Sequence, residues 1–259
     1  NLLAITIAIF FFRQLLGKQN PWLLTLFALS PGLILSLQYD LADSLALALA
    51  IGGLVFYTKK RLKISFVLLA LGMFARESVG LFIISIVMAE LFTHRLRPAL
   101  LFFATTFPYI FYEILLARLW GNPGVNTSFS NNIGLPLQGI YLTLQKLPLW
   151  PLSSGIKTAS IIMVIIIILA ALTHTLKILR QKIDLFALGI LVHAVFALMA
   201  SVAIWETYAS AGRVFTGITP FILLSHLKNK SIFSLIAIIF LCTLTIFTLL
   251  RPFIISPNI

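Results

Sequence analysis

Apolar residues form long runs along this chain, and short polar segments separate each run from the next. The runs cover residues 2–16, 22–37, 41–57, 62–75, 78–92, 98–119, 156–176, 185–205, 213–227 and 232–250. A helix that is apolar on all faces has to be buried in protein or in lipid, and most of these runs approach the length of a membrane-spanning helix. The pattern therefore predicts an all-α fold, a polytopic transmembrane helical bundle of about ten spans. We expect a single transmembrane domain over residues 1–259.

The composition fits a membrane protein better than a water-soluble one. Hydrophobic residues make up 60% of the chain and charged residues 10%, with a mean hydropathy of +1.07. A soluble domain could not cover so much apolar surface. The net charge of +12 would indicate nucleic acid binding in a soluble protein, but here the Lys and Arg residues lie in short groups between apolar runs. We therefore expect membrane lipid, and no nucleic acid, as a partner.

The basic residues give the orientation of the chain in the membrane. Of the 19 Lys and Arg residues, 13 lie in the odd-numbered connections between runs, at Arg13, Lys18, Lys59, Lys60, Arg61, Lys63, Arg95, Arg97, Lys177, Arg180, Lys182, Lys228 and Lys230. Cytoplasmic loops carry an excess of Lys and Arg, so these connections are predicted to be cytoplasmic. Most of the acidic residues fall toward the other face, where mixed charges gather. A functional site is therefore expected on the non-cytoplasmic face.

Two carboxylates, Asp40 and Asp43, stand between the second and third apolar runs. A carboxylate near hydrocarbon is costly unless it is paired, faces water or lies at a helix end. Residues three apart project from one face of a helix, so we interpret the pair as the mouth of a site. The structural alternative is that one acid caps the third helix and the other interacts favourably with its dipole.

A second candidate is the corner at Arg76 and Glu77, which follows the run 62–75. That run predicts a helix only about 21 Å long, shorter than a hydrocarbon core of roughly 30 Å, so the corner is expected below the membrane surface. There Arg76 could hold a phosphate and Glu77 could orient it or a sugar hydroxyl. A simple hairpin tip is the alternative. Glu113, inside the run 98–119, lies deep enough to need a partner.

The outer turn before the run 213–227 holds Trp205, Glu206, Tyr208 and Arg213. An aromatic belt explains Trp205 and Tyr208 without a ligand, but it does not explain Glu206 or Arg213. We expect Arg213 to open another short helix, of about 22 Å, and it is the strongest single candidate for ligand binding.

The longest connection covers residues 120–155 on the outer face. Its first half, residues 121–132, is rich in turn-forming residues and predicts an open loop. Residues 136–150 place apolar side chains at helical spacing, which predicts a short helix at the membrane interface. The loop is either a functional lid or a plain connector.

The remaining motifs indicate no other chemistry. His94, His174 and His226 are expected at cytoplasmic helix ends, and His193 is expected to be a hydrogen-bonded core residue. They give no metal-binding pattern, and the single Cys242 excludes a disulfide or zinc framework built on cysteine. There is no hydrolase pattern and no glycine-rich phosphate loop.

Three short motifs carry a family resemblance: the acids of Asp40-Leu41-Ala42-Asp43, the corner Ala75-Arg76-Glu77, and the stretch 213–220. In these motifs and in its helix order the chain resembles the GT-C class of integral-membrane glycosyltransferases, and within it the mannosyltransferase-like bacterial members that form cell-surface glycopolymers. The resemblance implies transfer of a sugar, with mannose as a candidate, from a polyprenyl-phosphate carrier to a glycolipid or glycopolymer acceptor. It also implies the bacterial inner (plasma) membrane, with the active face non-cytoplasmic.

The resemblance implies roles for individual residues as well. Asp40 and Asp43 correspond to the acidic pair of the family's second outer loop and are expected to be catalytic. Arg76, Glu77, Glu206, Tyr208 and Arg213 are expected to bind substrate, with Arg213 near the carrier phosphate. The family's leading catalytic acid lies in the first outer loop, which here would precede Asn1, so we expect this chain to lack the N-terminal helix and that loop. The lipid-linked sugar donor takes the place of a cofactor; a divalent metal stays open, and no residue pattern supports one.

Two other classes of function stay open. A transporter or flippase for the lipid carrier would place ionisable groups near the membrane midplane, whereas here they gather at one face. A non-catalytic membrane subunit of a glycan assembly pathway would need no charged constellation.

Overall fold

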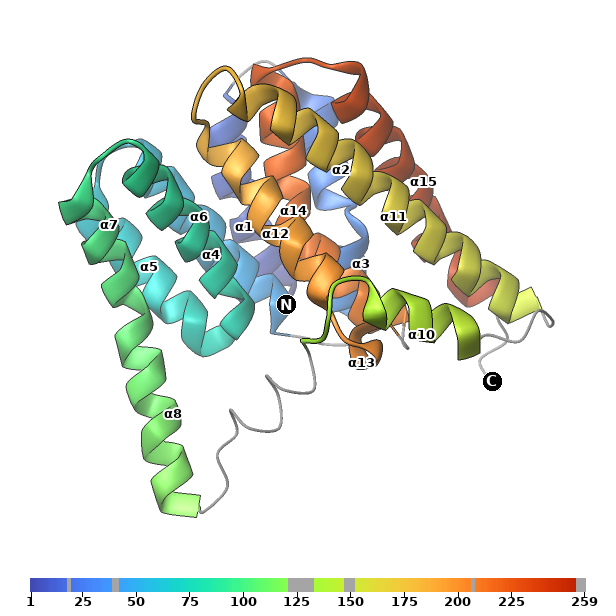
Figure 1. Ribbon diagram of the computed structural model, residues 1–259, viewed down its shortest axis with the longest axis horizontal. Helices are drawn as coiled ribbons and strands as arrows, with labels where there is room; N and C mark the ends of the chain where they lie inside the picture. The colour runs from blue at the N-terminus through green and yellow to red at the C-terminus, as the bar shows by residue number, and fades with distance from the viewer. Residues whose placement is uncertain (18–19, 39–41, 121–132, 147–151, 206–207, 255–259) are drawn as a thin grey trace.

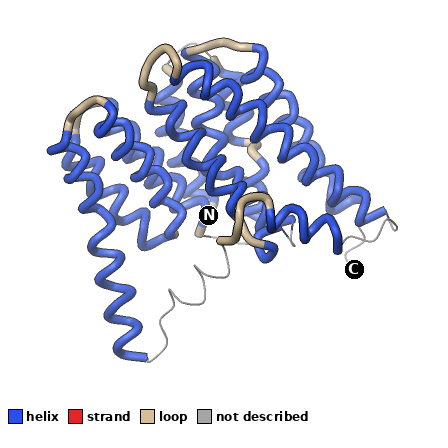
Figure 2. Tube along the Cα trace, viewed as in Figure 1, coloured by secondary structure: helices blue, strands red, loops and turns tan. Residues whose placement is uncertain are grey.

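The computed structural model describes residues 1–17, 20–38, 42–120, 133–146, 152–205 and 208–254. Within these ranges the regular elements are helices and no strand occurs, as Figure 2 shows. An isolated antiparallel bridge joins Ile133 to Ala200. The predicted all-α fold is therefore confirmed.

The helices follow one another in the order shown in Figure 1. Their bounds are α1 (Leu2–Leu16), α2 (Pro21–Ala28), α3 (Pro31–Gln38), α4 (Asp43–Thr58), α5 (Leu62–Ala75), the 3-10 helix η1 (Glu77–Val79), α6 (Gly80–Phe92), α7 (Leu96–Phe103), the 3-10 helix η2 (Ala104–Thr106), α8 (Phe107–Trp120), α10 (Gln138–Lys146), α11 (Leu152–Leu179), α12 (Leu185–Met199), α13 (Val202–Trp205), α14 (Tyr208–Lys228) and α15 (Ile232–Ile254).

Four of the described helical segments are long and apolar enough to cross a membrane: Pro21–Gln38, Leu96–Leu119, Thr158–Leu179 and Ile232–Leu250. Shorter apolar helices accompany them at Leu2–Leu16, Asp43–Thr58, Leu62–Ala75 and Leu185–Met199. By length and composition, this chain is a membrane protein.

Some apolar runs are split into two helices. The run 22–37 breaks between α2 and α3, where Pro31 has no backbone N–H to continue the helical ladder. The run 185–205 breaks at Ala200, because the backbone N–H groups of Gly134 and Leu137 donate to the carbonyls of Met199 and Leu198. Hydrophobicity alone does not mark either break.

Helix α14 corrects one prediction. It begins at Tyr208 and contains 21 residues, which makes it about 31 Å long, so the expectation that Arg213 opens a short helix is wrong. The residues before Arg213 are mostly small or polar, so they do not extend the apolar run, although the alanines among them favour a helix. The other predicted short helix is confirmed, since α5 ends at Ala75 after 14 residues.

Helices pack closely through the centre of the bundle. Helix α4 contacts α1 and α5, while α12 contacts α6, α11 and α14. At the crossing of α12 and α14, a Cβ on Gly189 would lie 2.2 Å from the ring of Phe221, which is fully buried. A small residue at this position permits the two backbones to approach, as is common between membrane helices.

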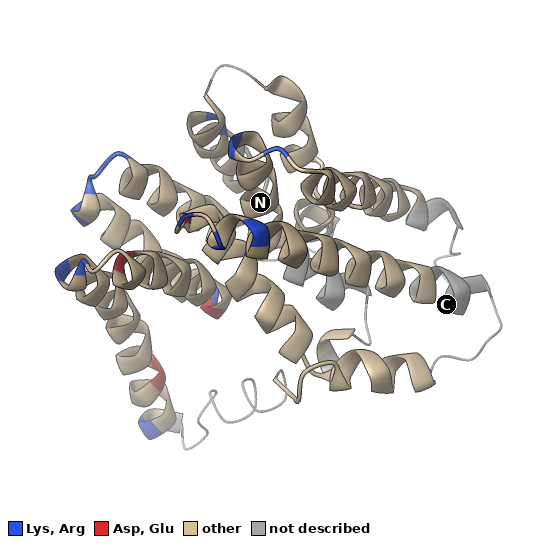
Figure 3. Ribbon diagram, turned by 45° about the horizontal axis from the view of Figure 1, so that its top comes forward, with Lys and Arg blue, Asp and Glu red and all other residues tan. Residues whose placement is uncertain are grey.

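The bundle has two chemically different ends. The connections α6–α7, α11–α12 and α14–α15 lie together at the upper end of Figure 1, and the end of α4 joins them through contacts of Tyr57 with α6. Most Lys and Arg positions in Figure 3 lie on these connections, so we call this the basic end. The start of α4 and the α5–α6 corner lie at the other end, which we call the Asp43 end. This grouping agrees with the predicted positions of the basic connections on one side.

The short helix predicted within residues 136–150 is present as α10 (Gln138–Lys146). It packs against α12 and α13 at the Asp43 end (Figure 1). The crossing is close, because a Cβ on Gly139 would lie 2.2 Å from the carbonyl oxygen of Ala200. The position of α10 at a membrane interface stays a prediction, and the loop 121–132 lies outside the described residues.

Candidate functional site

An ion pair between Asp43 and Arg76 is the centre of the candidate site. The Nη1 atom of Arg76 lies 2.5 Å from Oδ1 of Asp43, and the two side chains are 24% and 5% exposed. Asp43 is the first residue of α4 and Arg76 follows the last residue of α5. These helices are neighbours joined by a short connection, so the start of one meets the end of the other. The sequence singled out both residues, in separate motifs, and the structure brings them together.

The start of α4 does not depend on Asp43 as a cap. Ala42 occupies the cap position and makes no side-chain cap hydrogen bond. The backbone N–H of Ser44 instead donates to Oγ of Ser36, at 3.1 Å, and Oγ of Ser44 donates to Oδ1 of Asn1, at 2.6 Å. The Asp43 carboxylate lies in the first turn, where the helix dipole favours it, and turns to Arg76. Of the structural alternative, only the favourable interaction of Asp43 with the dipole of α4 therefore applies to Asp43.

Glu77 follows Arg76 but has a different environment. The N–H of Arg76 makes the last helical hydrogen bond of α5, to the carbonyl of Gly72, and the extended backbone conformation of Arg76 then ends the helix. The chain then enters η1, where Glu77 is exposed. One residue of the corner is thus half-buried and paired, whereas the next presents its carboxylate to the surroundings.

Helix α8 adds aromatic and acidic groups beside this corner. Tyr109 and Tyr112 contact the ring of Phe74 edge-on, at centroid distances of 6.2 and 5.6 Å. The hydroxyl of Tyr109 hydrogen-bonds Glu113 and lies within electrostatic range of Glu77. The prediction that Glu113 needs a partner is therefore confirmed. Helix α8 thus brings a phenol and a carboxylate beside the end of α5.

The other predicted site residues are described less fully. Tyr208 is the first residue of α14 and Arg213 lies in its second turn, and the structure describes their backbone only. Helix α14 packs against α3, where a Cβ on Gly32 would fall on the side chain of Thr216. The start of α14 therefore lies at the Asp43 end, as Figure 1 shows. Asp40 and Glu206 lie outside the described residues.

This arrangement can bind an anion. A guanidinium has several N–H donors in a planar fork, and the contact with Asp43 holds that fork in one orientation while leaving donors for a second group. Glu77 can accept hydrogen bonds from hydroxyl groups close by. Across the described ranges, no group of three His, Cys, Asp or Glu side chains is arranged to hold a metal ion.

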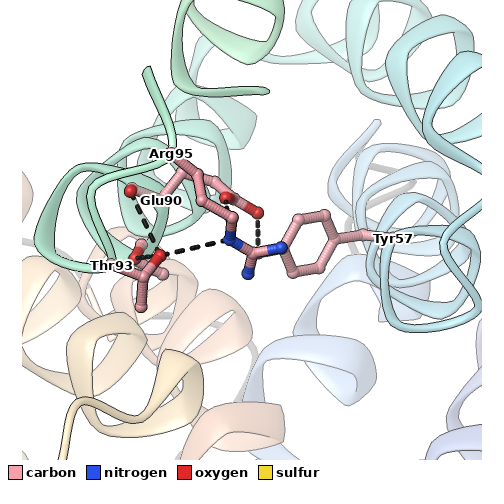
Figure 4. A network of polar contacts seen from close by, with 5 residues as sticks. Tyr57, Glu90, Thr93 and Arg95 are labelled. Carbon is pink, nitrogen blue, oxygen red and sulfur yellow. Dashed lines mark hydrogen bonds and ion pairs between the residues drawn. The ribbon is translucent and has the colours of Figure 1, made fainter. Parts of the chain in front are cut away.

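A second buried carboxylate, Glu90, was not singled out from the sequence. At the basic end its Oε1 accepts a hydrogen bond from the hydroxyl of Tyr57 at 2.5 Å, and its Oε2 lies 3.0 Å from Nε of Arg95. Figure 4 shows Tyr57, Glu90 and Arg95 close together, with Thr93 beside Arg95. The signal that could have found it is an acid inside an apolar helix, followed five residues later by an arginine.

Three of the four histidines have structural partners. His174 contacts Oγ of Ser225 and of Ser231, at 3.0 and 2.7 Å, and His226 contacts Oγ of Ser234 at 2.7 Å. These contacts join α11, α14 and α15 at the basic end, where the sequence placed His174 and His226. His193 is buried, and its Nδ1 lies 2.8 Å from the carbonyl oxygen of Gly189. Its predicted role as a hydrogen-bonded core residue is confirmed.

The resemblance to GT-C glycosyltransferases rests on short motifs around Asp40, Arg76 and Arg213, and it stays a prediction. The charges and contacts at the Asp43 end provide the basis for a functional argument. A scan against protein-family models, a search of curated proteins and a search of solved structures find no match to this chain.

Proposed function

We propose that this protein is an integral-membrane glycosyltransferase that uses a polyprenyl-phosphate sugar at the Asp43 end. The observation that carries the proposal is the Asp43–Arg76 ion pair beside the exposed carboxylate of Glu77. This combination lies at the end of a short helix, remote from the basic connections. Glycosyl transfer from a lipid phosphate needs a cation that binds the phosphate leaving group and a carboxylate that binds hydroxyl groups. This corner offers both.

In the proposed reaction, Arg76 binds the phosphate of the carrier. An acceptor hydroxyl attacks the anomeric carbon, the bond from that carbon to the phosphate oxygen breaks, and polyprenyl phosphate leaves with the negative charge. Arg76 stabilises this charge as it develops, and Asp43 keeps the guanidinium in position. Because Asp43 is buried in its pair, we assign it this positioning role, although the sequence suggested a catalytic one.

Glu77 accepts a hydrogen bond from a sugar or acceptor hydroxyl and so orients it for the reaction. The proton of the acceptor goes to a carboxylate, for which Asp40 is the candidate. Tyr208 and Arg213, from the start of α14, complete the substrate site together with Glu206, and Arg213 is a second cation for the phosphate.

The proposed topology has about ten spans, more than the four segments that meet the length criterion by themselves. The shorter apolar helices cross within the bundle, where neighbouring helices cover their ends. The Asp43 end then faces the non-cytoplasmic side of a bacterial plasma membrane, and mannose is one candidate for the sugar.

A non-catalytic membrane subunit is the second candidate. The observation in its favour is that Arg76 is already neutralised by Asp43, as expected for an ion pair that only joins α4 to α5. A transporter is favoured less, because most of the described charged groups lie toward the two ends of the bundle (Figure 3).

The test is a transfer assay with the full chain in proteoliposomes, using polyprenyl-phosphate mannose and related lipid-linked sugars. We expect the wild-type protein to release polyprenyl phosphate. Glu77→Gln should lower the transfer rate by about a hundredfold, because the hydroxyl group that Glu77 orients is then misplaced for the reaction. Glu113→Gln is the matched control, since Glu113 is bound to Tyr109, and it should retain most activity.

Normal turnover by Glu77→Gln at equal protein abundance would remove Glu77 from the site. Absence of turnover by the wild type with every lipid-linked sugar would favour the non-catalytic subunit.

A further inference from the structure

A cavity at the basic end has the chemistry of a second ligand site. It measures roughly 680 Å³ and lies between the start of α2 and the connection from α14 to α15. Its volume falls in the range of small-molecule pockets. The cavity is at the end of the bundle opposite to Asp43, so the proposed glycosyl transfer does not use it.

The polar side of the cavity is basic. It is lined by Lys230, His226, Asn20 and Ser231. Lys230 is exposed, and no carboxylate of the described residues is placed as its ion-pair partner. The nearby Lys228 is already engaged, because its Nζ lies 3.4 Å from Oδ2 of Asp184 and 4.4 Å from the ring centroid of Phe186. Lys230 is therefore the cation that this cavity offers to an anion.

The imidazole of His226 is held in a defined position beside Lys230. Its Nδ1 contacts Oγ of Ser234, and its ring meets Trp22 edge-on at a centroid distance of 6.3 Å. Ser231 hydrogen-bonds His174, which is buried. These contacts anchor the cavity wall to α11, so the polar groups do not depend on a loose loop for their positions.

Two helices also begin at the cavity. Helix α2 starts at Pro21, and its cap residue Asn20 makes no side-chain cap hydrogen bond. Helix α15 starts after Ser231, which caps it by accepting from the N–H of Ser234. The positive ends of both helix dipoles add to the charge of Lys230.

The other side of the cavity is apolar and leads toward the lipid. Leu23, Leu227, Ile232 and Leu235 line it. Ile232 and Leu235 are 63% and 40% exposed, and Ile239, one turn further along α15, is 53% exposed. A cation at the mouth followed by an apolar helix face matches the order of phosphate headgroup and acyl chain in a phospholipid.

We propose that this cavity binds an anionic phospholipid through its phosphate, with Lys230 and His226 at the headgroup and an acyl chain along α15. The lipid comes from the leaflet that faces the basic connections. Trp22 lines the cavity and is 45% exposed, and tryptophan is a residue type that favours the membrane interface. A soluble phosphate could use the same cation, but it would make no use of the exposed face of α15.

The test measures lipids that stay bound to the purified full chain, by native mass spectrometry after exchange into phosphatidylcholine nanodiscs that contain some phosphatidylglycerol. We expect the wild type to retain phosphatidylglycerol, and Lys230→Ala to lower its occupancy about tenfold, the usual effect of losing one charge-assisted contact. Lys230→Arg should restore binding. Lys182→Ala removes a charge at the same end outside the cavity lining and should stay within about twofold of the wild type.

Three results would overturn the proposal. The first is that phosphatidylcholine occupies the protein as often as phosphatidylglycerol. The second is that Lys230→Ala and Lys182→Ala lose phosphatidylglycerol to the same extent. The third is displacement of the lipid by inorganic phosphate, which would assign the cavity to a soluble anion. Because Lys230 is exposed, its variants are expected to fold, and gel filtration with circular dichroism checks this.

Discussion

The two ends of the bundle each contain a buried carboxylate paired with an arginine, and the surroundings of the two pairs differ. Asp43 and Glu90 are nearly inaccessible, at 5% and 1% exposure. Their arginine contacts are similar as well, at 2.5 Å for Asp43 with Arg76 and 3.0 Å for Glu90 with Arg95. Neither the burial nor the distance separates a functional pair from a structural one.

The difference lies in what completes each pair. Both oxygens of the Glu90 carboxylate have side-chain partners, because Oε1 accepts from Tyr57 on α4 and Oε2 contacts Arg95 (Figure 4). The Asp43 pair likewise joins two helices, but there the chain continues from Arg76 to the exposed carboxylate of Glu77. The Asp43 pair therefore has an exposed carboxylate next to it that can take part in binding, whereas the described contacts of Glu90 join α4 to the end of α6.

The largest expected effect is that of Arg76→Ala on glycosyl transfer. Removing a contact made chiefly in the transition state raises the barrier by roughly 2.7 to 4 kcal/mol, which lowers the rate by about a hundredfold to a thousandfold. Arg76→Lys should keep part of the activity, because it retains the charge but loses the planar fork. Turnover of polyprenyl-phosphate sugar in proteoliposomes measures both variants.

Arg95→Ala is the matched control for Arg76→Ala. It removes an arginine from the other pair and should leave turnover per folded molecule unchanged. If Arg76→Ala also left turnover per folded molecule unchanged and lowered only the amount of folded protein, both pairs would act only through stability.

The next largest effect is that of Arg95→Ala on stability. The substitution leaves Glu90 buried with Tyr57 as its side-chain partner. Breaking a buried pair costs roughly 3 to 5 kcal/mol, and because Arg95 is 59% exposed, we expect about 2 to 3 kcal/mol. Reversible unfolding in mixed micelles by sodium dodecyl sulfate measures the change. Arg97→Ala, two residues further, controls for loss of charge, and an equal effect of both would mean that the Glu90 pair contributes nothing specific.

The helix pattern could be predicted from the sequence where apolar residues fill the whole helix. Helices α1 and α5 have the bounds that the apolar runs indicate. The start of α14 could not be found in this way, because the segment from Tyr208 to Arg213 is too polar for an apolar run and is nevertheless helical. Breaks such as that at Ala200 depend on a distant backbone, here residues 133–137, and no local signal marks them.

The candidate site could be predicted only as separate residues. Asp43 and Arg76 stood out individually because a charge near hydrocarbon is costly unless it has a partner or faces water. Their pairing depends on how the α4–α5 hairpin aligns, and the sequence does not specify that alignment. Glu90 did not stand out because most of the acids fall toward the non-cytoplasmic face, whereas Glu90 and its partners Tyr57 and Arg95 lie at the basic end.

The smallest effect that separates the two pairs is expected from Asp43→Asn. Asparagine keeps the size of the side chain and a hydrogen bond to Arg76, but it removes the negative charge that holds the guanidinium in place. We expect kcat to fall about tenfold, equivalent to roughly 1.4 kcal/mol of barrier. The KM for the lipid-linked donor should not rise, since Arg76 keeps its full charge for the phosphate.

Glu90→Gln is the control at the basic end. It should change neither kcat nor KM, although it weakens the contacts with Arg95 and Tyr57 and so lowers stability. Steady-state kinetics on folded protein distinguish these outcomes. A KM that rises in Asp43→Asn while kcat stays constant would mean that Asp43 contacts the substrate, and unchanged values of both constants would reduce the Asp43–Arg76 pair to a structural link like that of Glu90.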